Sequence, residues 1–177
     1  MWNPDNAIYD DGEWITWTEI NSHLERLEFQ AQFPNLDLNL VPVFQDLLAV
    51  AIDYYELTGS HLQVYGDIGE LYGAITHGIK LHRNYAQGSD GKLGNDFVEI
   101  KTITPFKTNN RVTINLERNF SKLLIVKIDA NFDISGKLID RRALPKAKGS
   151  QLRLDWDQFA GDAGDPLKKP DPGSSRE

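Results

Sequence analysis

Apolar positions in the first half of the chain recur with the period of an α-helix. A first helix is predicted to begin at Thr16, because Glu19 stands three residues later, as in a capping box. The apolar positions Ile20, Leu24 and Leu27 then share one face of that helix. This stretch is therefore expected to be amphipathic.

Two further helices are predicted over residues 41–57 and 62–77. Pro42 suits the first turn of the earlier one, and Gly59 suits the position just after its last turn. Because residues 41–57 are apolar on nearly all sides, we expect this helix to lie against the core.

From about residue 79 the pattern changes to the alternation that is typical of β-strands. The segment KLLIVKI, residues 122–128, is almost continuously apolar, as expected of a central strand that is buried on both faces. The strands are predicted to follow one another as a meander: 79–85, 89–93, 96–103, 111–117 and 122–130, then a hairpin return over 131–144 and a short last element over 153–159.

This order of elements predicts one domain of mixed α/β class over residues 1–160. Its helical part covers about 14–77, after a loose start, and its sheet part covers about 79–158. Residues 161–177 are rich in glycine, proline and charge, and we expect them to form a disordered tail.

The composition excludes several kinds of chemistry. The chain of 177 residues contains no cysteine, which removes disulfides, thiolate zinc sites and cysteine nucleophiles. It has no uninterrupted apolar run of about 18 residues, so no membrane-spanning helix is expected. Its acidic, polar beginning is unlike a secretory signal. We therefore expect a cytoplasmic protein without a membrane partner.

The distribution of charge matters more than its sum. A net charge of -7 argues against a nucleic-acid partner. Within residues 76–122, however, eight lysines and arginines stand against four acids, so this segment carries a net charge of +4. A basic segment inside an acidic chain leaves open either a nucleic-acid partner or a chance variation in composition.

Within that segment, GSDGKLGNDFVEIKT, residues 88–102, predicts a hairpin with charged groups on one face. A two-residue turn at Gly94-Asn95 would pair Leu93 with Asp96. Counting outward along the two strands, Asp90 then stands opposite Glu99. Directly opposed residues point to the same face, with Cβ atoms about 4.5–5.5 Å apart.

The period of two places Lys101 on the same face as Glu99, and Val98 and Ile100 on the other face, toward the core. Because opposed like charges destabilise a hairpin, a divalent cation between Asp90 and Glu99 would offset the repulsion. Mg²⁺ suits a few carboxylates with water and phosphate oxygens, and Mn²⁺ is the alternative metal. A solvated hairpin without metal is the competing interpretation.

A third carboxylate, Glu70, lies in the predicted helix 62–77. Small residues in the same helix, Gly66, Gly69, Gly73 and Ala74, would let it approach a sheet closely. We therefore expect Glu70 to come near the strands.

Taken together, Glu70, Asp90 and Glu99-Ile100-Lys101 resemble the motif of the PD-(D/E)xK nuclease superfamily, the restriction-endonuclease-like fold. The resemblance covers about residues 62–130, and this part of the chain is similar to small uncharacterised bacterial members of the superfamily. It implies a central mixed β-sheet preceded and flanked by N-terminal helices. It also implies Mg²⁺-dependent hydrolysis of phosphodiester bonds by an endonuclease, with DNA as the expected substrate, in restriction, defence or repair.

The resemblance also implies roles for these residues. Asp90, Glu99 and the Ile100 carbonyl would hold the metal, Glu70 would bind it directly or through water, and Lys101 would orient the attacking water. Two features depart from the family pattern. Ser89 stands where proline gives the motif its name, and residues 108–122 are predicted as strand and turn where the family usually has a helix.

Outside the motif, Lys107, Asn109, Asn110 and Arg111 could contact phosphates, and a solvated loop is the equal alternative. A homodimer or a partner protein is compatible with the chain. Two other functions stay open. One is a catalytically silent module of the same fold that binds nucleic acid or a protein, and the other is a hydrolase of smaller phosphoesters.

Overall fold

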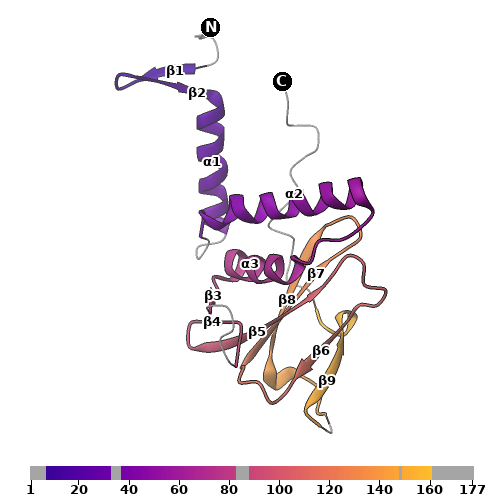
Figure 1. Ribbon diagram of the computed structural model, residues 1–177. Coiled ribbons are helices and arrows are strands. Elements are labelled where there is room, and N and C mark those ends of the chain that lie inside the picture. The colour runs from indigo at the N-terminus through magenta and orange to yellow at the C-terminus, as the bar shows by residue number, and fades with distance from the viewer. Residues whose placement is uncertain (1–6, 33–36, 83–87, 148, 161–177) are drawn as a thin grey trace.

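The computed structural model describes residues 7–32, 37–82, 88–147 and 149–160. Within them the protein is of mixed α/β class, as predicted (Figure 1). Its helices are α1 (Trp17–Gln32), α2 (Leu40–Thr58) and α3 (Tyr65–His77). No helix in this part of the chain is both long and apolar enough to cross a membrane.

The central sheet is mixed and has five strands in the order β3-β4-β5-β7-β8. The strands β3 (Lys80–Leu81), β4 (Gly91–Leu93) and β5 (Asp96–Ile103) are antiparallel neighbours, β5 runs parallel to β7 (Lys122–Ile128), and β7 is antiparallel to β8 (Ile134–Asp140). The predicted meander is therefore wrong at β5, because a parallel neighbour requires a crossover connection.

That crossover contains β6 (Arg111–Asn115), which pairs with β9 (Gln151–Asp155) in a separate two-stranded antiparallel ladder. The short 3-10 segments η2 (Arg141–Ala143) and η3 (Trp156–Gln158) follow β8 and β9. Of the predicted strand over 79–85, residues 79–82 are described and form a strand at Lys80–Leu81, and its remainder lies outside the described residues, as does the predicted tail, 161–177.

Both faces of the sheet are covered, which explains the continuously apolar β7. Its residues Leu124, Val126 and Ile128 join the core that α2 and α3 form on one face. Leu123 and Ile125 join a second core that β6 and β9 form on the other face. All five side chains are at most 1% exposed, so the prediction of a buried central strand is confirmed.

Local signals at the helix ends are also confirmed. The amide of Thr16 donates to the Glu19 carboxylate at 2.8 Å, and the amide of Glu19 donates to the Thr16 hydroxyl at 3.2 Å, which completes the capping box. Gly59 ends α2 in the left-handed conformation, at φ 66°. α3 begins at Tyr65 instead of Leu62, because Leu62 packs against the first core ahead of the helix.

The start of the chain was expected to be loose, and this is wrong for residues 7–16. They form a hairpin of β1 (Ala7–Asp10) and β2 (Glu13–Thr16). Its turn is Asp11-Gly12, with φ values of 43° and 93°. Positive φ at both central residues matches a type I′ turn, for which Asp-Gly is a strong sequence signal. The Asp-Gly dipeptide is thus a local sequence signal for this hairpin.

The expectation that the second helix lies against the core is confirmed, although only one side of α2 is buried. Phe44, Leu48 and Ala51 face the core, whereas Val50 is 55% and Leu57 86% exposed. The reason is visible in Figure 1, where α3 and the sheet lie along one side of α2 only. α1 extends away from the sheet and carries the β1–β2 hairpin at its far end.

Candidate functional site

The predicted site lies where β4 ends and leaves β5 with an uncovered edge. The β4–β5 register is Leu93 with Asp96, Lys92 with Phe97 and Gly91 with Val98, as predicted. Gly94 has φ 59°, and positive φ at the first central residue alone matches a type II′ turn. Because the ladder stops at Val98, the following residues of β5 have no partner strand on the β4 side within the described part of the chain.

Asp90 occupies this open edge, but it does not form a ladder pair with Glu99. Its own amide donates to the Val98 carbonyl at 3.0 Å, and its Oδ2 accepts the amide of Ile100 at 2.6 Å. The N–H and C=O of one strand residue point to the same side, so the Ile100 carbonyl also points to the edge that holds Asp90. Two of the groups that the resemblance assigns to metal binding, Asp90 and the Ile100 carbonyl, thus lie at the same edge of β5.

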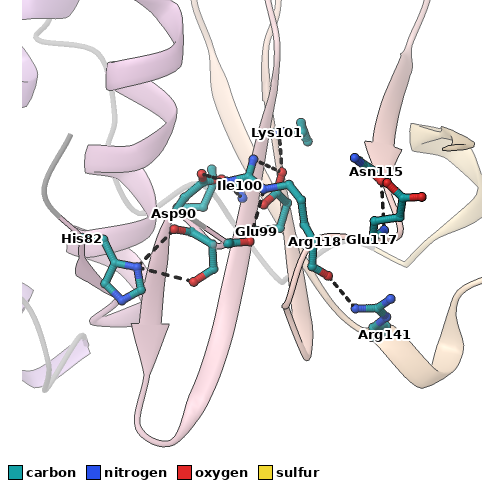
Figure 2. A network of polar contacts seen from close by, with 11 residues as sticks. His82, Asp90, Glu99, Ile100, Lys101, Asn115, Glu117, Arg118 and Arg141 are labelled. Atoms are coloured by element: carbon teal, nitrogen blue, oxygen red, sulfur yellow. Dashed lines mark hydrogen bonds and ion pairs between the residues drawn. The ribbon is translucent and has the colours of Figure 1, made fainter. Parts of the chain in front are cut away.

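His82 fixes the backbone that carries Asp90. Its amide donates to the Asp90 carbonyl at 2.9 Å, and its ring Nδ1 lies 3.1 Å from the Ser89 carbonyl (Figure 2). A carbonyl oxygen only accepts, so this contact is a hydrogen bond in the tautomer that carries its proton on Nδ1. Ser89, which stands in place of the motif's proline, is buried.

Glu99 is fully buried, at 0% exposure, with one oxygen satisfied and one without a partner. Its Oε1 lies 2.7 Å from Lys101 Nζ and 2.7 Å from Arg118 Nη1. Its Oε2 has no hydrogen-bond partner among the described residues. Burial raises the pKa of Glu99, and the hydrogen bond from Lys101 opposes that rise. Buried polar atoms are rarely left unpaired, so Oε2 of Glu99 is available to bind a further ligand.

The residue that sequence reasoning missed is Arg118. Its guanidinium donates to Glu99 Oε1 at 2.7 Å, to Asp90 Oδ1 at 3.1 Å and to the Gly88 carbonyl at 3.2 Å (Figure 2). The repulsion expected between the two carboxylates is therefore offset by an arginine. The parallel pairing of β5 with β7 brings the turn before β7 beside β5, and no local pattern in the sequence indicates this.

Arg141 holds that turn in place. Its guanidinium donates to the carbonyls of Leu116, Arg118 and Phe120, the latter two at 2.9 Å and 3.0 Å. It also lies over the Phe120 ring, 4.4 Å from the centroid. The backbone of Arg118 is thereby fixed, independently of what its side chain binds.

Glu70 approaches the site from α3, on the face of the sheet that carries Ile100. The prediction that small residues allow a close approach is confirmed for Gly69, where an added Cβ would lie 2.1 Å from Thr102 Oγ1, and for Gly73. It is wrong for Gly66, which faces open space.

The charge of Glu70 is coupled to the site. Burial raises the pKa of Glu70, the negative charges of Asp90 and Asp67 raise it further, and the positive charge of Lys101 lowers it. Glu70 therefore shares an electrostatic environment with two of the motif residues.

On the other face of the sheet, the side chains of Glu99 and Lys101 open on a pocket of about 200 Å³. Its wall is formed mainly by neutral polar residues of β6 and β9. The lining residues are Glu99, Lys101, Thr113, Ile114, Asn115, Arg118 and Gln151. Two cations and several neutral hydrogen-bonding groups thus surround the end of a buried carboxylate.

The proposed phosphate-contacting residues lie at the start of β6, the strand that continues into the pocket wall. Lys107 Nζ donates to the Arg111 carbonyl, and the Asn110 carbonyl accepts the amide of Trp156 at 2.8 Å. The Arg111 guanidinium, 3.1 Å from Asp155, lowers the pKa of that carboxyl. Arg111 and Asn109 are exposed, so this loop is accessible, but its arginine already has an acidic partner.

The donor set fits a divalent cation by its chemistry. Asp90 Oδ1 and Glu99 Oε1 both contact one guanidinium, so a single cationic group can bridge them. The partner-free Glu99 Oε2 and the Ile100 carbonyl add two hard oxygen donors of the kind that Mg²⁺ prefers. Within the described ranges, however, no group of three or more His, Asp or Glu side chains is gathered for a metal.

No family model and no curated protein sequence matches this chain. A protein class can therefore be proposed only from the geometry of the site and from the motif resemblance.

Proposed function

We propose that this protein is a Mg²⁺- or Mn²⁺-dependent nuclease of the PD-(D/E)xK superfamily that hydrolyses phosphodiester bonds, with DNA as substrate. The observation that carries the proposal is that four motif residues come together at one uncovered edge of the sheet. They are Asp90, Ile100, Glu99 and Lys101. There, a fully buried carboxylate keeps one oxygen without a partner. A merely structural glutamate at that depth would be expected to have both oxygens paired.

The chain's own groups suggest a division of roles. Asp90, Glu99 and the Ile100 carbonyl would hold the cation, with Glu70 adding negative charge from the α3 side. A divalent cation supplies charge stabilisation at the phosphoryl oxygens and lowers the pKa of water. Lys101, 30% exposed and held at Glu99, is positioned to orient a water molecule and to offset charge on the phosphate.

The pocket beside the site supports a phosphodiester substrate. Its cations Lys101 and Arg118 match a phosphate, and its neutral residues Thr113, Asn115 and Gln151 can hydrogen-bond to phosphate or sugar oxygens. The exposed loop at Lys107 would extend this contact along a strand. A role in restriction, defence or repair is consistent with such an activity.

A second candidate is a module of the same fold without catalysis. Arg118 favours it, because the arginine already neutralises Asp90 and Glu99 and makes a metal unnecessary for stability. The nuclease and the silent module differ in whether the protein cleaves nucleic acid.

The test is cleavage of supercoiled plasmid, linear duplex DNA, single-stranded DNA and RNA with Mg²⁺ or Mn²⁺, and with EDTA as the metal-free control. We expect metal-dependent cleavage of DNA that is lost in Lys101→Ala and in Asp90→Asn. The matched controls are Lys92→Ala and Asp96→Asn. Both residues lie on the same hairpin, where Lys92 packs over the Phe97 ring and Asp96 pairs with Lys122.

The outcomes separate the candidates. Cleavage that is lost with Lys101 and kept in both controls supports the nuclease and identifies the substrate class. Cleavage that persists in Lys101→Ala and Asp90→Asn excludes this site. Absence of cleavage, with nucleic-acid binding retained, favours the silent module.

A further inference from the structure

Arg118 occupies the position that the proposed function assigns to a cation. Each terminal nitrogen of its guanidinium contacts a different carboxylate, Nη1 at Glu99 and Nη2 at Asp90, and Nε contacts the Gly88 carbonyl (Figure 2). Charge-assisted bonds of this forked kind are among the strongest that a protein makes. One oxygen of each carboxylate, Asp90 Oδ1 and Glu99 Oε1, is therefore already engaged.

A metal and Arg118 would need the same oxygens. Asp90 Oδ1 and Glu99 Oε1 each accept a hydrogen bond from the guanidinium. A divalent cation that binds both oxygens would therefore displace the guanidinium, because two cationic groups so close together repel each other.

The construction of the turn allows such an exchange. Arg141 fixes the carbonyls of Arg118 and Phe120, whereas the contacts of the Arg118 side chain are all made at its guanidinium end. That side chain is 30% exposed and lines the pocket. The guanidinium can leave the carboxylates by side-chain rotation into the pocket, while the backbone stays in place.

We propose that Arg118 is an internal counter-ion that competes with the divalent metal for Asp90 and Glu99, an inference that rests on the proposed function. Without metal, Arg118 holds the two carboxylates together and stabilises the fold. With metal, it gives them up. The intrinsic affinity of the site for metal is therefore higher than the affinity that the native chain shows.

The experiment is calorimetric titration of Mn²⁺ into the full chain, without nucleic acid, for the native protein, Arg118→Gln and Arg118→Lys. We expect Mn²⁺ to bind Arg118→Gln about tenfold or more tightly, because the loss of a charged competitor of this strength changes affinity by that order. Arg118→Lys, which keeps the charge without the fork, should be intermediate. Arg142→Gln, a change at an exposed arginine of η2, is the control with unchanged affinity.

A second measurement does not depend on catalysis. Without metal, Arg118→Gln should unfold at a lower temperature than the native chain, because the two carboxylates lose their counter-ion. Saturating Mn²⁺ should raise the unfolding temperature more in Arg118→Gln than in the native protein. Circular dichroism of the variant before each titration verifies that it is folded.

The outcomes distinguish this proposal from the proposed function. Mn²⁺ binding to the native chain with equal or weaker binding to Arg118→Gln overturns the competition and leaves the metal site intact. Binding only in Arg118→Gln supports the competition in its strongest form. Absence of binding in every variant, with all of them folded, overturns both.

Discussion

The contact of α3 with β5 can be tested at Gly69, which lies next to Glu70. A Cβ built on Gly69 would lie 2.1 Å from Thr102 Oγ1 and 3.3 Å from Thr102 Cβ. Ordinary contact begins at 3.4 Å, so Gly69→Ala requires the hydroxyl or the whole helix to move by about 1.3 Å.

The expected cost follows from two opposed terms. Overpacking of this kind costs about 1–3 kcal/mol. Alanine recovers about 0.8–1.0 kcal/mol of helix propensity relative to glycine. We therefore expect Gly69→Ala to lower the free energy of unfolding by about 0–2 kcal/mol. Gly66→Ala, in the same helix but facing open space, should be neutral or stabilising.

Urea unfolding followed by circular dichroism measures these differences, and a double-mutant cycle assigns them to the contact. Thr102→Ala removes the clashing hydroxyl and leaves the Cβ at a tolerable 3.3 Å. The variant carrying both Gly69→Ala and Thr102→Ala should recover at least half of the loss, whereas Thr102→Val, which keeps a branched side chain, should not restore it.

The reasoning is refuted if Gly69→Ala is as stable as Gly66→Ala, or if the cycle shows no coupling with Thr102. A further consequence concerns the site. Because Gly69 lets α3, which carries Glu70, approach β5 closely at Thr102, Gly69→Ala should weaken Mn²⁺ binding even where the protein is fully folded. Gly66→Ala should leave that affinity unchanged.

Three other predictions concern buried or capping groups. Lys137 is 7% exposed, donates to the Trp156 carbonyl at 2.9 Å and lies 4.2 Å from that ring. Lys137→Met should therefore cost about 1–3 kcal/mol and alter tryptophan fluorescence. Thr16→Ala removes the capping box of α1 and should cost about 1 kcal/mol, measured as lost helical circular dichroism. The pKa of Glu70 is raised in the folded state, so its ionisation destabilises the fold as pH rises above about 4. Glu70→Gln should then gain stability relative to the native chain between about pH 4 and pH 7 in metal-free urea titrations.

Each of these has a matched control within the chain. Lys127→Met, at a lysine 6.0 Å from the same tryptophan ring, should cost less than Lys137→Met. Thr18→Ala, inside α1, should be neutral or stabilising. Glu56→Gln, at an exposed residue of α2, should show no gain over this pH range that matches Glu70→Gln. If a control responds as strongly as its test variant, the named contact is not the cause.

Much of the fold could be predicted from sequence signals between residues that are close together in the chain. The capping box at Thr16, the stop at Gly59 and the register of the β4–β5 hairpin depend on residues fewer than ten positions apart, and each was predictable. The Asp11-Gly12 hairpin depends on an equally local signal, although it is not among the predicted elements. The resemblance to the PD-(D/E)xK motif stays a prediction that cleavage must test.

The candidate site, too, was predictable only as far as local patterns determine it. Alternation along β5 placed Glu99 and Lys101 on one face and Ile100 in the core, because a strand has a period of two whatever surrounds it. The sequence alone therefore determined which side chains of β5 could act together.

Only the tertiary structure decided what those side chains meet. Arg118 reaches Glu99 from 19 residues away because β5 and β7 pair in parallel, and β6 forms a pocket wall because it pairs with β9. Periodicity fixes the face on which a residue lies, but the choice of neighbouring strand depends on how both faces of the sheet are buried. That choice is a property of the whole packed chain, and here it placed an arginine between the two carboxylates where the sequence had predicted a metal.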